Sequence, residues 1–251
     1  MGELIVVGSG TGIPSLRRAS PSLVVVSDKA TIQVDSGPGS LRKMLEAGIT
    51  YLDMDLLLYT HIHPDHVADL VPLLFACKYA DQPRKKDLLC LGGEGFLRYY
   101  EELKKLYGQW MEAQTYRFRV EELSEKPLLF RNTTITCTPM AHAPESIAFR
   151  IEFEDGKSVV ISGDTHSTPK LAGFASRTNL LVLECSFPDG KKVEGHLTPA
   201  LAGKIAKESR CKRLLLTHLY PLCDQFDMQE QCRRTFQGEI ILAADLMRIA
   251  I

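Results

Sequence analysis

The heptapeptide THIHPDH at positions 60–66 places four candidate metal ligands, His61, His63, Asp65 and His66, within six residues directly after an apolar run. The first two histidines are two residues apart, so in extended chain their side chains point the same way. The proline that follows favours the first position of a helix, and a carboxylate in a first helical turn is stabilised by the helix dipole. We therefore expect a strand-to-helix turn that gathers both pairs around one point and supplies two adjacent metal sites.

Short apolar runs alternate with amphipathic stretches and Gly/Pro punctuation along the chain, which is typical of an α/β protein. The predicted strands are 4–7, 23–27, 31–34, 55–59, 88–91, 133–138, 147–153, 158–161, 180–183, 213–216 and 239–242. We expect a helix before Gly48, one beginning at Pro64, one over 97–106 and one after Thr198. The expected apolar face of the second helix comprises Val67, Leu70, Val71, Leu74 and Phe75, and that of the third Leu97, Tyr100, Leu103 and Leu106.

Two internal sequence similarities indicate a single domain over 1–251, built from related halves of roughly 1–125 and 126–251. One predicted hairpin ends in QVDSG at 33–37 and another in VVISGD at 159–164; DLLLYTH ends on His61 and RLLLTH on His218. Strands that end in polar residues at the same edge would bring Asp35, His61, Asp164 and His218 to one rim of a sheet sandwich. Chance similarity between common strand patterns is the alternative.

The composition of these 251 residues limits the classes of partner. Thirty Lys and Arg against 31 Asp and Glu give a net charge of −1, so no global field draws the chain onto nucleic acid or an anionic membrane. No apolar run reaches the roughly 18–20 residues of a membrane span. Seven scattered cysteines without a Cys-x-x-Cys pair fit a reducing compartment. With no basic leader ahead of the first strand, we expect a cytoplasmic protein.

The motif at 60–66 resembles the His-x-His-x-Asp-His signature of metallo-β-lactamase-fold hydrolases, and the resemblance runs from residue 4 to residue 250. His142 after strand 133–138, Asp164 in ISGDT and His218 in LLLTH follow the order of the family's other ligands. The resemblance implies an α/β fold of the αββα sandwich type with two divalent metal ions. One ion would be held by His61, His63 and His142 and the other by Asp65, His66 and His218, with Asp164 bridging.

Zinc is the expected metal because imidazole suits it, and the same donor set would accept Mn²⁺ or Fe²⁺. Two divalent cations, two aspartates and a bridging hydroxide would leave a charge of about +1, which would stabilise an anionic transition state. By the resemblance, members that hydrolyse β-lactams carry cysteine at the position of Asp164, whereas members that cleave phosphodiesters or thioesters carry aspartate.

Three segments outside the ligand set resemble ribonuclease Z and its phosphodiesterase relatives. They are the glycine loop at 8–14, the strand end LECSF at 183–187 and HLTP at 196–199. Ile13 at the third glycine position breaks a dinucleotide fingerprint, so no organic cofactor site is expected. By this resemblance Asp65, His196 and Glu184 are the catalytic candidates. A metal-bridging hydroxide would attack phosphorus while His196, oriented by Glu184, protonates the leaving oxygen; a solvated loop histidine and a surface carboxylate are the alternatives.

The interval between His142 and Asp164 holds only 21 residues, whereas tRNA-processing members often carry a long basic arm there. Basic clusters at 84–86 and at Lys204, Lys207, Arg210, Lys212 and Arg213 are typical of solvated faces. We therefore expect an arm-less phosphodiesterase that acts on small-molecule or nucleotide phosphodiesters, with RNA as a weaker candidate and no membrane partner.

Several alternatives stay open at this point. The same metals could hydrolyse a thioester, lactone or other carbonyl substrate, or serve tRNA 3′-end processing. A non-enzymatic, metal-stabilised module is disfavoured because it would not need His196 or Glu184. The aromatic stretch 96–118 is expected to form core or a homodimer interface. Asp35 resembles the family's aspartate that steadies a ligand histidine, and the roles of His166 and Cys223 are undecided.

Overall fold

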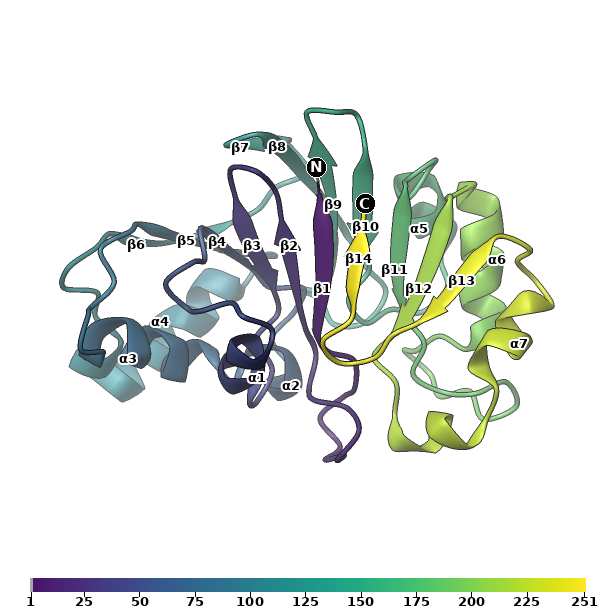
Figure 1. The fold of residues 1–251 in the computed structure, drawn as a ribbon, viewed down its shortest axis with the longest axis horizontal. Helices are drawn as coiled ribbons and strands as arrows, with labels where there is room; N and C mark the ends of the chain where they lie inside the picture. Colours follow the sequence, from purple (N-terminus) through teal and green to yellow (C-terminus); the bar gives the residue numbers. More distant parts are fainter. Residues whose placement is uncertain (1) are drawn as a thin grey trace.

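Two sheets of seven strands lie face to face at the centre of the molecule (Figure 1). The computed structural model describes residues 2–251. The first sheet runs in the order β14 (Arg248–Ala250), β1 (Glu3–Gly8), β2 (Ser22–Val26), β3 (Thr31–Val34), β4 (Leu56–Leu58), β5 (Leu88–Gly92) and β6 (Phe118–Glu122). The second runs β13 (Glu239–Leu242), β12 (Arg213–Thr217), β11 (Leu180–Glu184), β10 (Ser158–Ile161), β9 (Ile147–Phe153), β8 (Thr133–Pro139) and β7 (Leu128–Phe130).

Helices cover the outer face of each sheet, so the expected αββα sandwich is confirmed (Figure 1). The first sheet carries α1 (Ser40–Glu46), α2 (Pro64–Val67), α3 (Leu70–Tyr79), α4 (Phe96–Tyr107) and the 3₁₀ turn η1 (Gly108–Met111). The second carries α5 (Pro169–Phe174), α6 (Pro199–Ser209), η2 (Pro221–Gln225) and α7 (Met228–Arg233). None of the helices within residues 2–251 is long and apolar enough to cross a bilayer.

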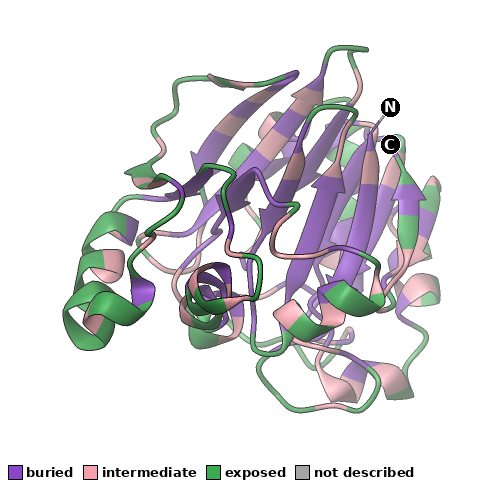
Figure 2. Ribbon diagram, turned by 60° about the vertical axis from the view of Figure 1, so that its left-hand side comes forward, coloured by how far each residue is buried: buried purple, intermediate pink, exposed green. Residues whose placement is uncertain are grey.

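Strands that are buried on both faces explain the apolar runs of the sequence. In β1, Leu4 and Val6 enter the cluster between the two sheets, whereas Ile5 and Val7 enter the cluster beneath the helices of the first half. Figure 2 shows the same pattern across the molecule, with buried strands at the centre and half-exposed helices outside. This packing fixes the strand ends from which the site is built.

The helix expected from Pro64 is divided into α2 and α3. The backbone N–H of Ser36 donates to the carbonyl of His66 at 2.7 Å, and the N–H of Asp69 donates to the carbonyl of Ser36 at 2.9 Å. Since the His66 carbonyl is used outside the helix, the helical ladder stops there. Asp69 then accepts a hydrogen bond from Leu41 N at 3.0 Å, at the start of α1.

Two details of the sequence prediction were wrong. Phe75, Leu97 and Leu106 are exposed, although they were expected on apolar faces; Tyr100 and Leu103 do pack against the core. Strands β6, β7 and β14 were not predicted. They are short, lie at sheet edges and carry exposed residues, so they lack a continuous apolar run.

In both sheets, three antiparallel pairings are followed by three parallel ones. Parallel strands end at the same edge of a sheet, where ligand-binding residues of α/β proteins gather. The residues that follow or end these strands are Asp35 after β3, His61 near β4, Asp164 after β10, Glu184 in β11 and His218 after β12. These side chains therefore meet at one rim of the sandwich.

Candidate metal centre

His61, His63, His142 and Asp164 form the first group of candidate ligands. His61 Nε2 lies 3.0 Å from His63 Nδ1, which lies 3.2 Å from His142 Nε2. Asp164 Oδ2 is 3.9 Å from His61 Nε2 and 3.8 Å from His142 Nε2. The carbonyl of Gly195 accepts a hydrogen bond from His142 Nδ1 at 3.1 Å, which turns the Nε2 atom toward the group.

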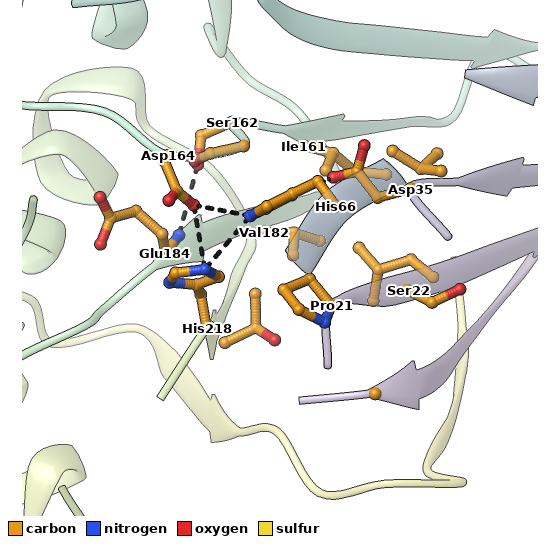
Figure 3. A pocket seen from close by; sticks show the side chains of 15 residues that line it. Pro21, Ser22, Asp35, His66, Ile161, Ser162, Asp164, Val182, Glu184 and His218 are labelled. Carbon is orange, nitrogen blue, oxygen red and sulfur yellow. Dashed lines mark hydrogen bonds and ion pairs between the residues drawn. The ribbon is translucent and has the colours of Figure 1, made fainter. Parts of the chain in front are cut away.

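Asp65, His66 and His218 form the second group, beside the other oxygen of Asp164. Figure 3 shows His66, His218 and Asp164 turned toward one another. The Nε2 atoms of His66 and His218 are 3.2 Å apart, and Asp65 Oδ2 lies 3.8 and 3.5 Å from them. Asp164 Oδ1 is 3.5 Å from His66 Nε2 and 3.3 Å from His218 Nε2. Asp164 thus faces one group with each oxygen, as a bridging carboxylate would.

The spacing of these atoms fits metal ions. Zinc held tetrahedrally at about 2.0–2.1 Å places its ligand atoms roughly 3.3 Å apart, and the separations above span 3.0–3.9 Å. Asp164 Oδ1 is buried without a hydrogen-bond partner among the described residues. The Nδ1 atoms of His66 and His218 are engaged elsewhere, so with both rings unprotonated two nitrogen lone pairs would face each other across 3.2 Å. A cation between them would relieve both features.

Buried carboxylates set the charge of the centre. Burial alone would lower the pKa of His66, but the negative charges of Asp164 and Asp35 raise it to about 9. Burial would raise the pKa of Asp164, and the imidazoles of His218 and His66 lower it. In the first group, burial and the neighbouring imidazoles lower the pKa of His61. Asp164 is therefore ionised and His61 unprotonated, the forms in which these side chains bind metals, whereas the carboxylates hold a proton on His66 that a bound cation would displace.

Backbone geometry holds the ligands in place. Asp35 and His218 have φ of 59° and 55°, a left-handed backbone conformation that is uncommon for residues other than glycine. At Gly37 an added Cβ would lie 2.1 Å from the carbonyl oxygen of Asp65, so only glycine allows this approach. In the glycine loop, the Gly12 N–H donates to Asp65 Oδ2 at 2.9 Å. The loop thus positions a candidate ligand rather than a dinucleotide.

His196 and Glu184 lie beside the two groups. His196 Nδ1 donates to Glu184 Oε1 at 3.0 Å, and that oxygen also accepts the Thr165 N–H at 3.0 Å. Burial would lower the pKa of His196, but the hydrogen bond and charge of Glu184 raise it. Asp164, His196 and His218 also satisfy the spacing of a third metal-binding group. The pairing expected from sequence is present, and a ligand role for His196 is its competitor.

Sequence reasoning missed two buried hydroxyls in the centre, Thr60 and Ser186. Thr60 Oγ1 lies 2.8 Å from Asp35 Oδ2 and 3.0 Å from His61 Nδ1. Ser186 Oγ lies 2.6 Å from Glu184 Oε2 and 3.0 Å from His218 Nδ1. The available signal was their position directly before His61 and two residues after Glu184.

Other residues singled out from sequence lie around the centre or away from it. His166 is half-buried and lines a hollow with His142, whereas the Cys223 thiol is buried and donates to the Ser186 carbonyl at 3.1 Å. Arg84 is buried and donates to five backbone carbonyls, which rules out a phosphate-binding patch built on it. The second basic cluster is largely exposed on α6 and at the start of β12, away from the strand end that carries His218.

The aromatic stretch divides into two environments. Tyr99 and Tyr100 are half-buried against the core of the first half. Trp110 is 47% exposed and lies against Phe75 and Tyr79, at ring-centroid distances of 6.3 and 6.0 Å. The core expectation thus holds for Tyr99 and Tyr100, as it does for the buried Phe96 and Tyr116, but not for Trp110, and the homodimer stays a prediction.

The chain is similar to known proteins over most of its length. The family profile described as anti-Pycsar protein Apyc1 matches residues 2–239. The probable metallo-hydrolase YhfI of Bacillus subtilis is 27% identical, with 96% of each chain covered, and ribonuclease Z of Mycobacterium marinum is 27% identical over 99% of this chain and 98% of its own.

The solved structures show the fold. The crystal structure of YhfI, a metallo-β-lactamase-fold protein, has a TM-score of 0.87 at 24% identity, with both chains fully covered. A diphosphatase of the PhnP family has a TM-score of 0.76 at 20% identity, covering 100% of this chain and 98% of that one. The chain therefore has the metallo-β-lactamase fold.

Proposed function

Because this chain belongs to the family described as anti-Pycsar protein Apyc1, we propose that it is a metal-dependent hydrolase that cleaves phosphodiester bonds in small or nucleotide-type substrates. The observation that carries the proposal is the His196–Glu184 pair, joined at 3.0 Å beside the two ligand groups. Each of the first two ligand groups has three or more donors without this pair. A proton donor placed next to a dinuclear centre is what cleavage of an unactivated diester requires.

The chain's own residues divide the work in this proposal. The first group and the second group would each hold one divalent ion, with Asp164 shared between them. When bound, the ions would lower the pKa of a water molecule and offset the charge of the phosphate. Glu184 holds Nδ1 of His196, so Nε2 is the atom that can pass a proton to the leaving oxygen. The raised pKa of His196 keeps more of it in the acidic form near neutral pH.

Two features favour a small substrate. A hollow of about 480 Å³ beside the centre is lined by His142, His166 and Glu194, a volume in the range of about 300–1,000 Å³ typical of small-molecule sites. The interval between His142 and Asp164 is filled by the β9–β10 hairpin. With a net charge of −1, Arg84 buried and the second basic cluster away from the strand end that carries His218, neither basic cluster lies beside the centre to neutralise the phosphates of a long RNA.

The test is one metal-loaded preparation assayed against bis(p-nitrophenyl) phosphate, cyclic nucleotides, a pre-tRNA and a panel of thioesters and lactones. We expect diesters to be cleaved faster than monoesters and pre-tRNA to be a poor substrate at physiological salt. Asp164→Ala should abolish most activity, whereas Asp155→Asn, an exposed carboxylate in the β9–β10 turn, should leave it unchanged. Carbonyl turnover far above diester turnover, or efficient pre-tRNA cleavage, would overturn the proposal.

A further inference from the structure

We propose that the hydroxyls of Thr60 and Ser186 are positioning groups, each of which links a buried carboxylate to one histidine of a different metal site. The inference rests on the metal centre of the proposed hydrolase and names two residues that neither bind metal nor contact substrate. The first observation is the group of hydrogen bonds around the Asp35 carboxylate. This carboxylate accepts directly from His66 Nδ1 at 2.8 Å, and through Thr60 Oγ1 it reaches His61 Nδ1, by steps of 2.8 and 3.0 Å.

The hydrogen bonds around the Glu184 carboxylate follow the same arrangement as those around Asp35. This carboxylate accepts directly from His196 Nδ1 at 3.0 Å. Through Ser186 Oγ it reaches His218 Nδ1, by steps of 2.6 and 3.0 Å. One carboxylate thus holds two imidazoles in each half of the molecule, one directly and one through a hydroxyl. His61 belongs to the first ligand group and His218 to the second, so each metal site contains one hydroxyl-linked histidine.

Proton accounting shows what each hydroxyl does. An ionised carboxylate can only accept, so the single hydroxyl proton of Thr60 or Ser186 goes to Asp35 or Glu184. The hydroxyl oxygen must then accept from the imidazole, which places the proton of that ring on Nδ1. The Nε2 atom is left with its lone pair directed at the other ligands. A ligand histidine whose second nitrogen donates to an acceptor is held in one tautomer and orientation and is a stronger ligand.

The hydroxyls are not needed to hold the backbone. Thr60 N–H donates to Asp35 Oδ1 at 2.8 Å, and Ser186 N–H donates to Glu184 Oε2 at 3.2 Å. Removal of either hydroxyl leaves that backbone tether in place. Both hydroxyl residues are buried, with relative exposures of 1% for Thr60 and 0% for Ser186, so water cannot readily replace the lost link.

The experiment is a zinc titration of the whole chain in competition with a chromophoric chelator, without substrate. Thr60→Val, which keeps the side-chain shape, should weaken one of two binding steps about 10-fold or more. Thr60→Ser, which keeps the hydroxyl, should stay close to the unaltered protein. Ser186→Ala should weaken the other step by a similar factor, and Ser186→Thr should restore it.

The same substitutions made in a His63→Ala protein show which zinc-binding step each hydroxyl affects. His63→Ala removes a ligand of the first group only. In that protein Ser186→Ala should still weaken zinc binding, whereas Thr60→Val should have little further effect. The thermal stability of each metal-free variant shows whether it folds. If Ser186→Thr does not fold, the comparison of Thr60→Val with Thr60→Ser tests the inference.

The outcomes separate this inference from the proposed function. If Thr60→Ser binds zinc as weakly as Thr60→Val, or if both bind like the unaltered protein, the linking role is wrong while the metal centre stands. If the unaltered protein binds no zinc, the proposed function and this inference fall together. If zinc binds as expected but no diester is cleaved, the proposed function fails and the linking role stands.

Discussion

Replacement of His196 by alanine tests the proton donor directly. The imidazole is held by Glu184 at 3.0 Å and by Ser186 Oγ at 3.2 Å, both through Nδ1, so its orientation is fixed before substrate binds. A positioned general acid contributes about 10²–10⁴-fold to a rate, which corresponds to roughly 2.7–5.4 kcal/mol of transition-state stabilisation. We expect a loss of that size for a diester whose leaving group is an alkoxide such as a ribose hydroxyl.

The loss should depend on the leaving group. p-Nitrophenolate departs without much protonation, so bis(p-nitrophenyl) phosphate should be affected far less than an alkyl or ribose diester. The assay compares kcat/KM for both substrates in the unaltered protein and in His196→Ala, with metal content measured on the same samples. Phe187, whose ring centroid lies 5.8 Å from that of His196, provides a control: Phe187→Leu should not produce the leaving-group dependence.

Two results would refute this reasoning. An equal loss for both substrates would mean that His196 does not protonate the leaving group. A His196→Ala protein that has lost metal would assign His196 to the third ligand group, with Asp164 and His218. Glu184→Gln should show the same leaving-group trend. The loss of kcat/KM in Glu184→Gln should be substantial, since the Glu184 carboxylate accepts four hydrogen bonds and the NH₂ group of a glutamine would face donors at one end.

Three further predictions address the metal centre and the fold. Asp35→Asn should weaken zinc binding about 10–100-fold in a competitive titration, because an amide cannot accept all the hydrogen bonds from Thr60 and His66; unchanged affinity would contradict this. Chelation should lower the thermal midpoint and zinc should restore it, with about 2.7 kcal/mol of stabilisation at 100 times Kd; a midpoint indifferent to chelator would argue against bound metal. Arg84→Met should cost about 3–5 kcal/mol in urea unfolding, since several buried carbonyls lose their donor, whereas exposed Lys85→Ala should change stability by less than about 0.5 kcal/mol.

The sequence by itself determined the α/β class and singled out the densest group of candidate ligands. Strands such as β1 and β4 are apolar at consecutive positions because both of their faces are buried, and that pattern is legible without any tertiary contact. The candidate ligands could be found for a related reason. Asp164 and His218 stand where buried strands end, and the dense motif at 60–66, just after another buried strand, has few explanations other than metal binding. These local signals predict the α/β class and a metal-binding motif, whereas the αββα sandwich and the complete set of seven proposed ligands were implied by the resemblance to metallo-β-lactamase-fold hydrolases.

Only the tertiary structure decided how the groups between these elements pair. α2 ends because Ser36, from another segment, takes the carbonyl of His66. Arg84 is buried because carbonyls from 51–54 and 86–87 surround its guanidinium, although its sequence context is that of a solvated basic run. Thr60 and Ser186 gain their partners in the same way. Hydrophobic periodicity is repeated along the chain and can be read from it, whereas a hydrogen bond between distant segments depends on where the packed layers place one donor and one acceptor.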